Sequence, residues 1–160
     1  MITLVPYQVN YFDALVSYEL DEQQSSFALA PKYILTNPEI MANTLRKQYC
    51  ILYQEEPVGF FSLDLSDDRL IYTHTKESIL LRALSIMPNF QGKGIAKSML
   101  LLLPEFIKEQ YANLEEIVFG VNYENTNAYQ LYLKTGYCDS GRIYQGIKGS
   151  QHCMYKKLTK

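Results

Sequence analysis

Six consecutive residues carry the clearest chemical pattern in this chain. Gln91-Gly92-Lys93-Gly94-Ile95-Ala96 follows an apolar, strand-like run that ends at Pro88, and a long helix with an apolar face begins directly after it. Glycines in such a turn leave backbone N–H groups accessible, and a helix N-terminus adds the positive end of its dipole. Lys93 and Lys97 add positive charge at this helix N-terminus, where the dipole disfavours cations, so a nearby anion is the better explanation for them. The turn therefore predicts a bound anion.

Two common phosphate-binding motifs do not fit this turn. The P-loop pattern GxxxxGK[ST] is absent, because Ile95 and Ala96 follow Gly94. The dinucleotide pattern GxGxxG requires a third glycine where Lys97 stands. Another way of holding an anion must account for the sequence.

The same six residues match, at every fixed position, the Q/R-x-x-G-x-G/A signature of the GNAT superfamily of acyl-CoA-dependent N-acyltransferases. Leu84-Ser85-Ile86-Met87-Pro88 resembles the strand before that family's loop, and VGFF at 58–61 also fits. Downstream, NTNAYQLYLKTGY at 125–137 resembles its N-x-x-A-x-x-L-Y-x-K-x-G-F/Y segment. Two separate motifs in the right order identify the chain as a member of this superfamily.

The resemblance implies acetyl-CoA as the co-substrate. The pyrophosphate of coenzyme A would bind the turn, and the amide-bearing pantetheine arm would pair with exposed backbone at 84–86 as an added strand does. The implied cofactor-binding residues are Leu84, Ser85, Ile86, Gln91, Gly92, Lys93, Gly94, Ile95, Ala96, Lys97, Asn125 and Tyr132.

The resemblance also implies the proton donor. Amine attack on a thioester requires loss of a proton from the ammonium group and protonation of the departing thiolate. Tyr132, in the Leu-Tyr pair of the second motif, would donate to that thiolate; Asn125 would cap the short helix, contact the cofactor, or both. Position in the motif singles Tyr132 out among 14 tyrosines, and Tyr129 and Tyr137 are expected in the core or at its rim.

The general base is left open by the sequence. In some branches of the family a glutamate lies five residues before the motif asparagine, but Gly120 stands there. Deprotonation would then use water or another group. The open alternatives are Asp64, His74, Glu77, Glu124 and His152.

The acceptor amine is predicted from a weaker signal. Asp21 and Glu22 open a segment that resembles the helical segment of polyamine N-acetyltransferases, and acidic side chains would attract a cationic amine. A small amine such as a polyamine, acetylated by direct attack in a ternary complex, is the leading prediction. The alternatives are a protein or peptide N-terminus and, in another class, a non-catalytic acyl-CoA sensor.

Composition narrows the partners and the compartment. The 160 residues carry a net charge of −2 with only short basic clusters, which argues against a nucleic-acid partner. No signal peptide or membrane span is visible, no metal-ligand spacing occurs, and the odd count of cysteines, Cys50, Cys138 and Cys153, favours buried reduced thiols in the cytoplasm. Pairing into a homodimer through C-terminal strands is possible, as the family implies.

Hydrophobic periodicity predicts the elements that position these residues. A helix is expected at 11–20, with Asn10 as its cap, and the segment after it is expected to be helical in pieces interrupted around Pro31 and Pro38. Further helices are expected from 95 onward, with a kink or break at Pro104, and at 125–134, where Gly136 ends the helix. Strands are expected at 2–5, 49–53, 58–65, 79–87, 116–121, 138–144 and 152–158, with 66–78 as a loop or irregular strand.

The expected fold is α/β (α+β) and occupies residues 1–160 as one domain of GNAT type. Its central sheet is expected to be mixed but mostly antiparallel, with about seven strands and about four flanking helices. The resemblance implies that the fourth and fifth strands splay apart to admit the thioester.

Overall fold

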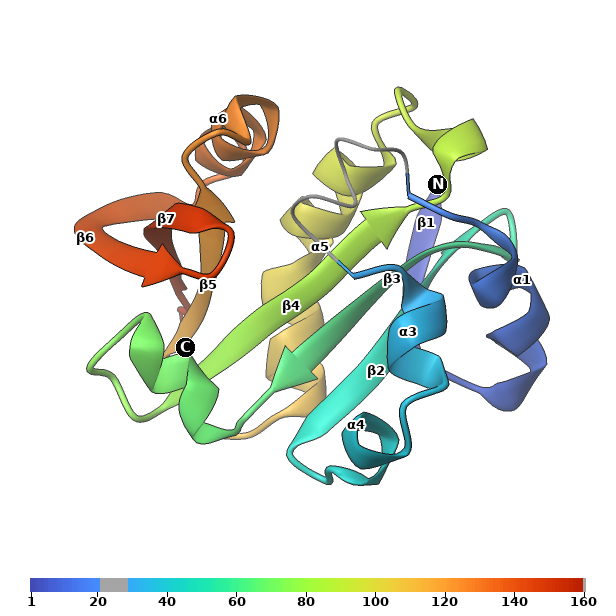
Figure 1. Ribbon diagram of the computed structural model, residues 1–160, viewed down its shortest axis with the longest axis horizontal. Coiled ribbons are helices and arrows are strands. Elements are labelled where there is room, and N and C mark those ends of the chain that lie inside the picture. Colours follow the sequence, from blue (N-terminus) through green and yellow to red (C-terminus); the bar gives the residue numbers. More distant parts are fainter. Residues whose placement is uncertain (21–28, 160) are drawn as a thin grey trace.

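The computed structural model describes residues 1–20 and 29–159, and its frame is one seven-stranded sheet (Figure 1). The strand order is β1-β2-β3-β4-β5-β7-β6, and of these neighbouring pairs β4 and β5 run parallel while the others run antiparallel. The strands are β1 (Ile2–Pro6), β2 (Arg46–Tyr53), β3 (Glu56–Asp64), β4 (Ser78–Ile86), β5 (Glu116–Asn122), β6 (Cys138–Gly146) and β7 (Gly149–Lys157). The predicted mixed sheet is confirmed.

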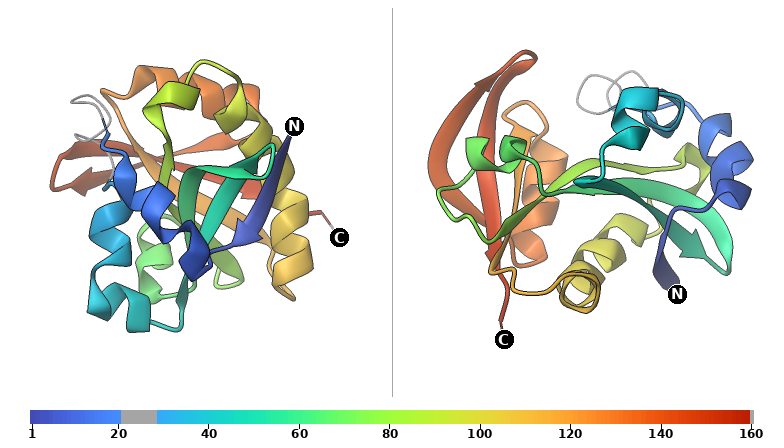
Figure 2. Two further views of the ribbon diagram at one scale, coloured as in Figure 1. Left: turned by 90° about the vertical axis from the view of Figure 1, so that its right-hand side faces the viewer. Right: turned by 90° about the horizontal axis from the view of Figure 1, so that it is seen from below.

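Helices cover both faces of the sheet (Figure 2). On one face lie α5 (Ile95–Gln110) and α6 (Thr126–Lys134), over a core that includes Phe61, Leu103 and Ile117. On the other lie α1 (Phe12–Ser17), α3 (Pro31–Leu35) and α4 (Pro38–Ala42), around a smaller core that includes Leu15 and Phe60. Three short 3-10 helices, η1 (Val9–Tyr11), η2 (Asp67–Ile71) and η3 (Pro88–Phe90), complete the described elements.

The sheet opens between β4 and β5. These strands pair only where Ser78–Leu80 lies beside Glu116–Val118, and beyond that point they diverge (Figure 1). On its other edge β4 pairs with β3 through a register shift, and Ala83 there has a positive φ of 56°. Such a bulge bends a strand and re-aims the residues after it. The predicted splay is therefore confirmed.

Prolines differ in effect from the sequence prediction. Pro31 and Pro38 begin α3 and α4 instead of interrupting a helix, because the first helical position needs no N–H donor. The helix α5 continues through Pro104 as a single element of 16 residues. Packing of its apolar face against the sheet offsets the missing hydrogen bond.

Three further predictions were wrong in detail. The first helix is shorter than 11–20: it follows η1 and ends at Ser17, and Tyr11, not Asn10, is its N-cap residue. Residues 67–71 of the expected loop form η2. Cys50 and Cys153 are buried as expected, but Cys138 is exposed because β6 is an edge strand. None of the helices formed by the described residues has the length and apolar character that crossing a bilayer requires.

Candidate active site

The glycine-rich turn has an unusual backbone that faces open space. Gly92 and Gly94 have φ values of 77° and 78°, a region that side chains with a Cβ adopt at a cost. No atom lies within 4 Å of where a Cβ would be at either residue. Both glycines are thus needed for the backbone conformation, and the space beside them can admit a ligand.

The N-terminus of α5 completes this turn. Gly94 is the N-cap residue, and no side chain caps the helix. The first N–H groups of a helix have no partner within it, so those of Ile95 to Lys97 are available to an anion. The Gln91 side-chain amide donates to the backbone oxygen of Ile86 at 3.0 Å, which ties the turn to the end of β4.

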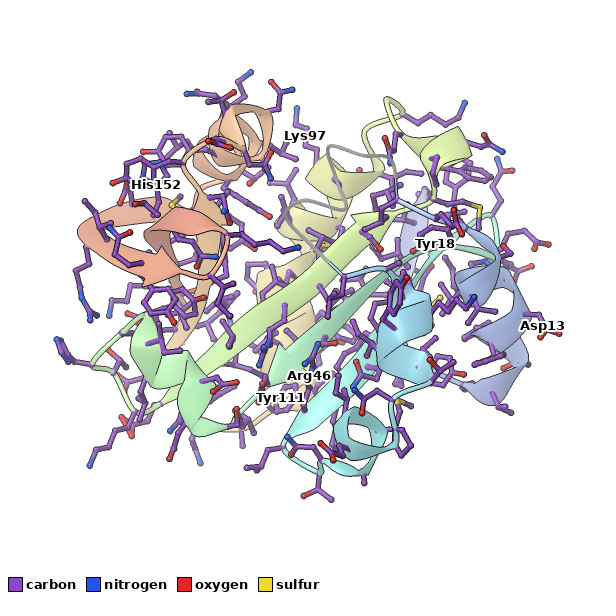
Figure 3. The ribbon with its side chains drawn as sticks, in the orientation of Figure 1. Asp13, Tyr18, Arg46, Lys97, Tyr111 and His152 are labelled. Atoms are coloured by element: carbon purple, nitrogen blue, oxygen red, sulfur yellow. The ribbon has the colours of Figure 1, made fainter. Side chains whose placement is uncertain are left out.

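A cleft of about 490 Å³ lies in front of the turn. Of the twelve predicted cofactor-binding residues, eleven line it and Lys93 does not, so Lys97 is the lysine placed at the cleft (Figure 3). The Ser85 hydroxyl within it is hydrogen-bonded to Tyr18 at 2.9 Å. The cleft also contains residues that the sequence prediction missed: Leu20, Phe90, Asn127, Ala128 and Leu131. The last three share a helical face with Tyr132 inside the quoted motif, and that spacing could have revealed them.

A second cleft of about 460 Å³ lies where β4 and β5 diverge. Its walls come from β2, η2, β4, β5 and the β6–β7 hairpin, and we call it the acceptor cleft. Leu84, Asn125 and Tyr132 line both clefts. These three residues therefore mark the place where the two cavities meet.

Comparison with known proteins decides the family. The model of the acetyltransferase (GNAT) family matches residues 12–137. The chain is 34% identical over 158 residues to an uncharacterized N-acetyltransferase, YbbJ, of Bacillus subtilis (strain 168), covering 98% of both chains. The chain belongs to the GNAT family.

Solved GNAT structures share the fold of the chain. An aminoglycoside acetyltransferase, AAC(6')-Ib, in complex with coenzyme A has a TM-score of 0.78 at 16% identity, over 98% of this chain and 95% of that one. Spermidine N-acetyltransferase from Vibrio cholerae, in complex with CoA and spermine, has a TM-score of 0.73 at 18% identity over the same shares. This GNAT chain is an acetyl-CoA-dependent acetyltransferase, and acetyl-CoA is its co-substrate.

Tyr132 is held by aromatic packing at the meeting point of the clefts. Its ring lies 4.5 Å from that of Phe119 on β5, measured between centroids. Burial raises the pKa of Tyr132 to about 12, so the phenol keeps its proton at neutral pH. Such a group can donate a proton and cannot act as a base. Asn125 begins α6 without a capping bond from its side chain, which corrects the predicted cap.

Gly120 leaves no space for the glutamate that some GNAT branches carry. A Cβ there would lie 2.2 Å from Gln151 Oε1 and 2.5 Å from Tyr72 Cε1. The Tyr72 hydroxyl donates to Gln151 Oε1 at 2.9 Å, and Gln151 Nε2 donates to Asn122 Oδ1 at 3.2 Å. Burial raises the pKa of Tyr72 to about 12. An amide and a protonated phenol thus occupy the space into which a side chain at position 120, such as the glutamate of some branches, would point.

None of the five open base candidates lines either cleft. Asp64 is buried, and its oxygens accept from the Ser66 backbone and from Arg82. His152 pairs with Asp139 at 3.0 Å, and its ring stacks between two tyrosines. The other three, His74, Glu77 and Glu124, are exposed.

The remaining predicted residues have plain structural positions. Tyr137 is buried in the core and donates to the backbone oxygen of Leu100 at 2.9 Å, and Tyr129 is half-buried at the rim, where it donates to Asp139. Both tyrosines therefore lie where the sequence predicted. Asp21 and Glu22, predicted to bind the acceptor, lie outside the described residues.

Proposed function

We propose that this chain transfers the acetyl group of acetyl-CoA to a small primary amine by direct attack in a ternary complex. The observation that carries the proposal is the sharing of Leu84, Asn125 and Tyr132 by the two clefts. A thioester at this junction would be reached by an amine from the acceptor cleft. No covalent intermediate on the protein is needed.

We call the cleft in front of the glycine-rich turn the cofactor cleft, and each part of it has a role in this proposal. Backbone N–H groups from Gly92 to Lys97 bind the pyrophosphate, and the Lys97 ammonium adds charge. Backbone groups of Leu84 to Ile86, beside the opening between β4 and β5, pair with the pantetheine amides. The Tyr132 phenol donates its proton to the thiolate as the C–S bond breaks.

The attacking amine loses its proton to bulk water before it enters the acceptor cleft. Gly120 offers no carboxylate, and the side chains beside it, Tyr72 and Gln151, do not accept a proton at neutral pH. The amine therefore reacts as the fraction that is already neutral, and the rate rises with pH until the amine is fully deprotonated.

The size of the acceptor cleft favours a small molecule over a protein chain. About 460 Å³ is within the range of small-molecule pockets. The structural neighbours include enzymes named for spermidine and for aminoglycosides, which are small polyamines and amino sugars. The polyamine prediction rests on Asp21 and Glu22, so we propose the wider class of small primary amines, with polyamines and aminoglycosides as the first candidates.

Release of free thiol tests the proposal. Acetyl-CoA is mixed with the protein and a panel of polyamines, aminoglycosides, aminocarboxylates and peptides, and the acetylated amine is identified by mass spectrometry. We expect thiol release that depends on a small amine. Measurable binding of acetyl-CoA without turnover of any amine would refute the proposal, and turnover of peptides alone would favour the alternative acceptor class.

A further inference from the structure

A row of polar side chains lies on the sheet face that α3 and α4 cover, and part of it lines the acceptor cleft. Strand pairing places Arg46 of β2 opposite Asp64 of β3, and Ser62 of β3 opposite Arg82 of β4. Cys50 of β2 packs among α1 and α3 residues, and Arg46 has the same parity along the strand, so its side chain lies on the same face of the sheet. Figure 3 labels Arg46. The lining of the cleft includes Arg46, Arg82 and Asp68.

Both acids near this row are engaged with Arg82. Arg82 Nη1 donates to Asp64 Oδ2 and to Asp68 Oδ2, each at 2.8 Å. The second oxygen of Asp64 accepts the Ser66 backbone N–H at 2.7 Å. The two carboxylates therefore satisfy Arg82 and hold it against the sheet.

Arg46 is left without such a partner. Its Nε is buried and has no hydrogen-bond acceptor among the residues that the structure describes. Burial and the neighbouring charge of Arg82 lower the pKa of Arg46 to about 10, against the opposing effect of the Asp64 and Asp68 charges, and the guanidinium stays charged at neutral pH. A buried guanidinium N–H without an acceptor is unfavourable. The Arg46 side chain as a whole is only partly buried and lines the cleft, so its terminal N–H groups are the ones from which a bound oxyanion would accept.

We propose that Arg46 binds a carboxylate on the acceptor, so that the substrate of the proposed function is an amine that carries this anion at its far end. A single guanidinium suits one carboxylate charge better than a phosphate dianion. A polyamine offers no acceptor for Arg46. The inference rests on the proposed function, because Arg46 and Tyr132 line the same cleft.

Strand geometry sets the separation of the two groups. Arg46 and Leu80 both lie opposite Asp64, and Leu84 is four residues farther along β4. By strand spacings the Cα atoms of Arg46 and Leu84 are roughly 13 Å apart along the strands and roughly 10 Å apart across them. The Arg46 side chain covers part of this distance. Several bonds must therefore separate amine from carboxylate, which excludes a free α-amino acid.

Matched acceptors test this assignment. The parent protein receives acetyl-CoA with 6-aminohexanoate, its neutral amide 6-aminohexanamide, or glycine, and thiol release gives kcat/KM. We expect 6-aminohexanoate to exceed both others by about tenfold or more, as a charge-assisted hydrogen bond provides. In Arg46→Gln the preference for acid over amide should fall to near unity, while Arg46→Lys should keep part of it.

Two controls make the outcomes distinct. Lys47→Gln removes a charge from the next residue of β2, which is exposed and points to the opposite face, and should keep the preference. Equal use of acid and amide by the parent, or an unchanged preference in Arg46→Gln, would overturn the role of Arg46 while leaving the proposed function intact. If no amine is turned over, the proposed function fails. Calorimetric titration of 6-aminohexanoate into the parent and Arg46→Gln proteins, each loaded with acetyl-CoA, still decides whether Arg46 binds a carboxylate.

Discussion

Substituting Gly94 by aspartate should remove coenzyme A binding with little loss of stability. Gly94 has a φ of 78° and no atom within 4 Å of the place where a Cβ would lie, so the new side chain meets no clash. The left-handed backbone costs a non-glycine residue roughly 1 kcal/mol, which corresponds to a fall in Tm of about 2–4 °C for a chain of this size. The added carboxylate would face the proposed pyrophosphate site.

Coulomb repulsion sets the larger effect. A carboxylate about 5 Å from a phosphate charge, at an effective dielectric constant near 20, costs about 3 kcal/mol. This corresponds to a loss of about two orders of magnitude in affinity. Gly94→Ala carries the same backbone cost without the charge and should bind coenzyme A far better than Gly94→Asp.

Gly141 supplies a matched control for this experiment. It has a φ of 84°, no atom within 4 Å of a Cβ, and a position on β6 away from both clefts. Gly141→Asp should lower Tm as much as Gly94→Asp and leave coenzyme A affinity unchanged, as calorimetric titration and thermal unfolding would show. A Kd for Gly94→Asp within about threefold of the parent value, or an equal loss in Gly141→Asp, would refute the anion-binding turn.

Three further predictions concern the acceptor cleft, the thiols and the phenols. Gly120→Glu should destabilise the fold by about 1–3 kcal/mol through overpacking, because Gln151 Oε1 lies 2.2 Å from the new Cβ. Denaturant unfolding should show that adding Gln151→Ala recovers part of this loss. Fully additive losses of stability from the two substitutions would contradict the clash. Alkylation followed by mass spectrometry should label exposed Cys138 first, since burial raises the pKa of the Cys50 thiol to about 12; labelling of Cys50 at the same rate would oppose it. Burial raises the pKa of Tyr72 and Tyr132 from 10.0 to about 12. The unfolded chain therefore loses these protons first, and the free energy of unfolding should fall as pH rises from 10 to 12. Tyr72→Phe should flatten that fall, and a rise in stability over this interval would contradict the burial of these phenols.

The cofactor cleft could be predicted from the sequence because its determinants are local. The turn at 91–96 and the motif at 125–137 are each contiguous, and their residues keep their spacing whatever the rest of the chain does. Eleven of the twelve predicted residues line the cleft for this reason. Lys93 does not line the cleft, and sequence spacing alone does not say which of two lysines on a turn lies beside it.

The acceptor cleft could not be predicted because its parts are distant in sequence. Tyr72 and Gln151 meet across 79 residues, and Arg46 comes from another strand again. One signal was present: glycine inside a buried strand marks the close approach of another group, and Gly120 has both Gln151 and Tyr72 against it. The sequence interpretation used Gly120 only as evidence that the glutamate base of some branches is missing.

The most direct test of the proposed chemistry is the single-turnover rate of acetyl transfer by Tyr132→Phe with the best acceptor amine. Phenylalanine keeps the ring that packs 4.5 Å from Phe119 and removes only the proton donor. We expect a rate lower by about two orders of magnitude, as the loss of a general acid produces, with acetyl-CoA affinity unchanged. A rate equal to that of the parent would contradict the placement of the chemistry at Tyr132, where the two clefts meet.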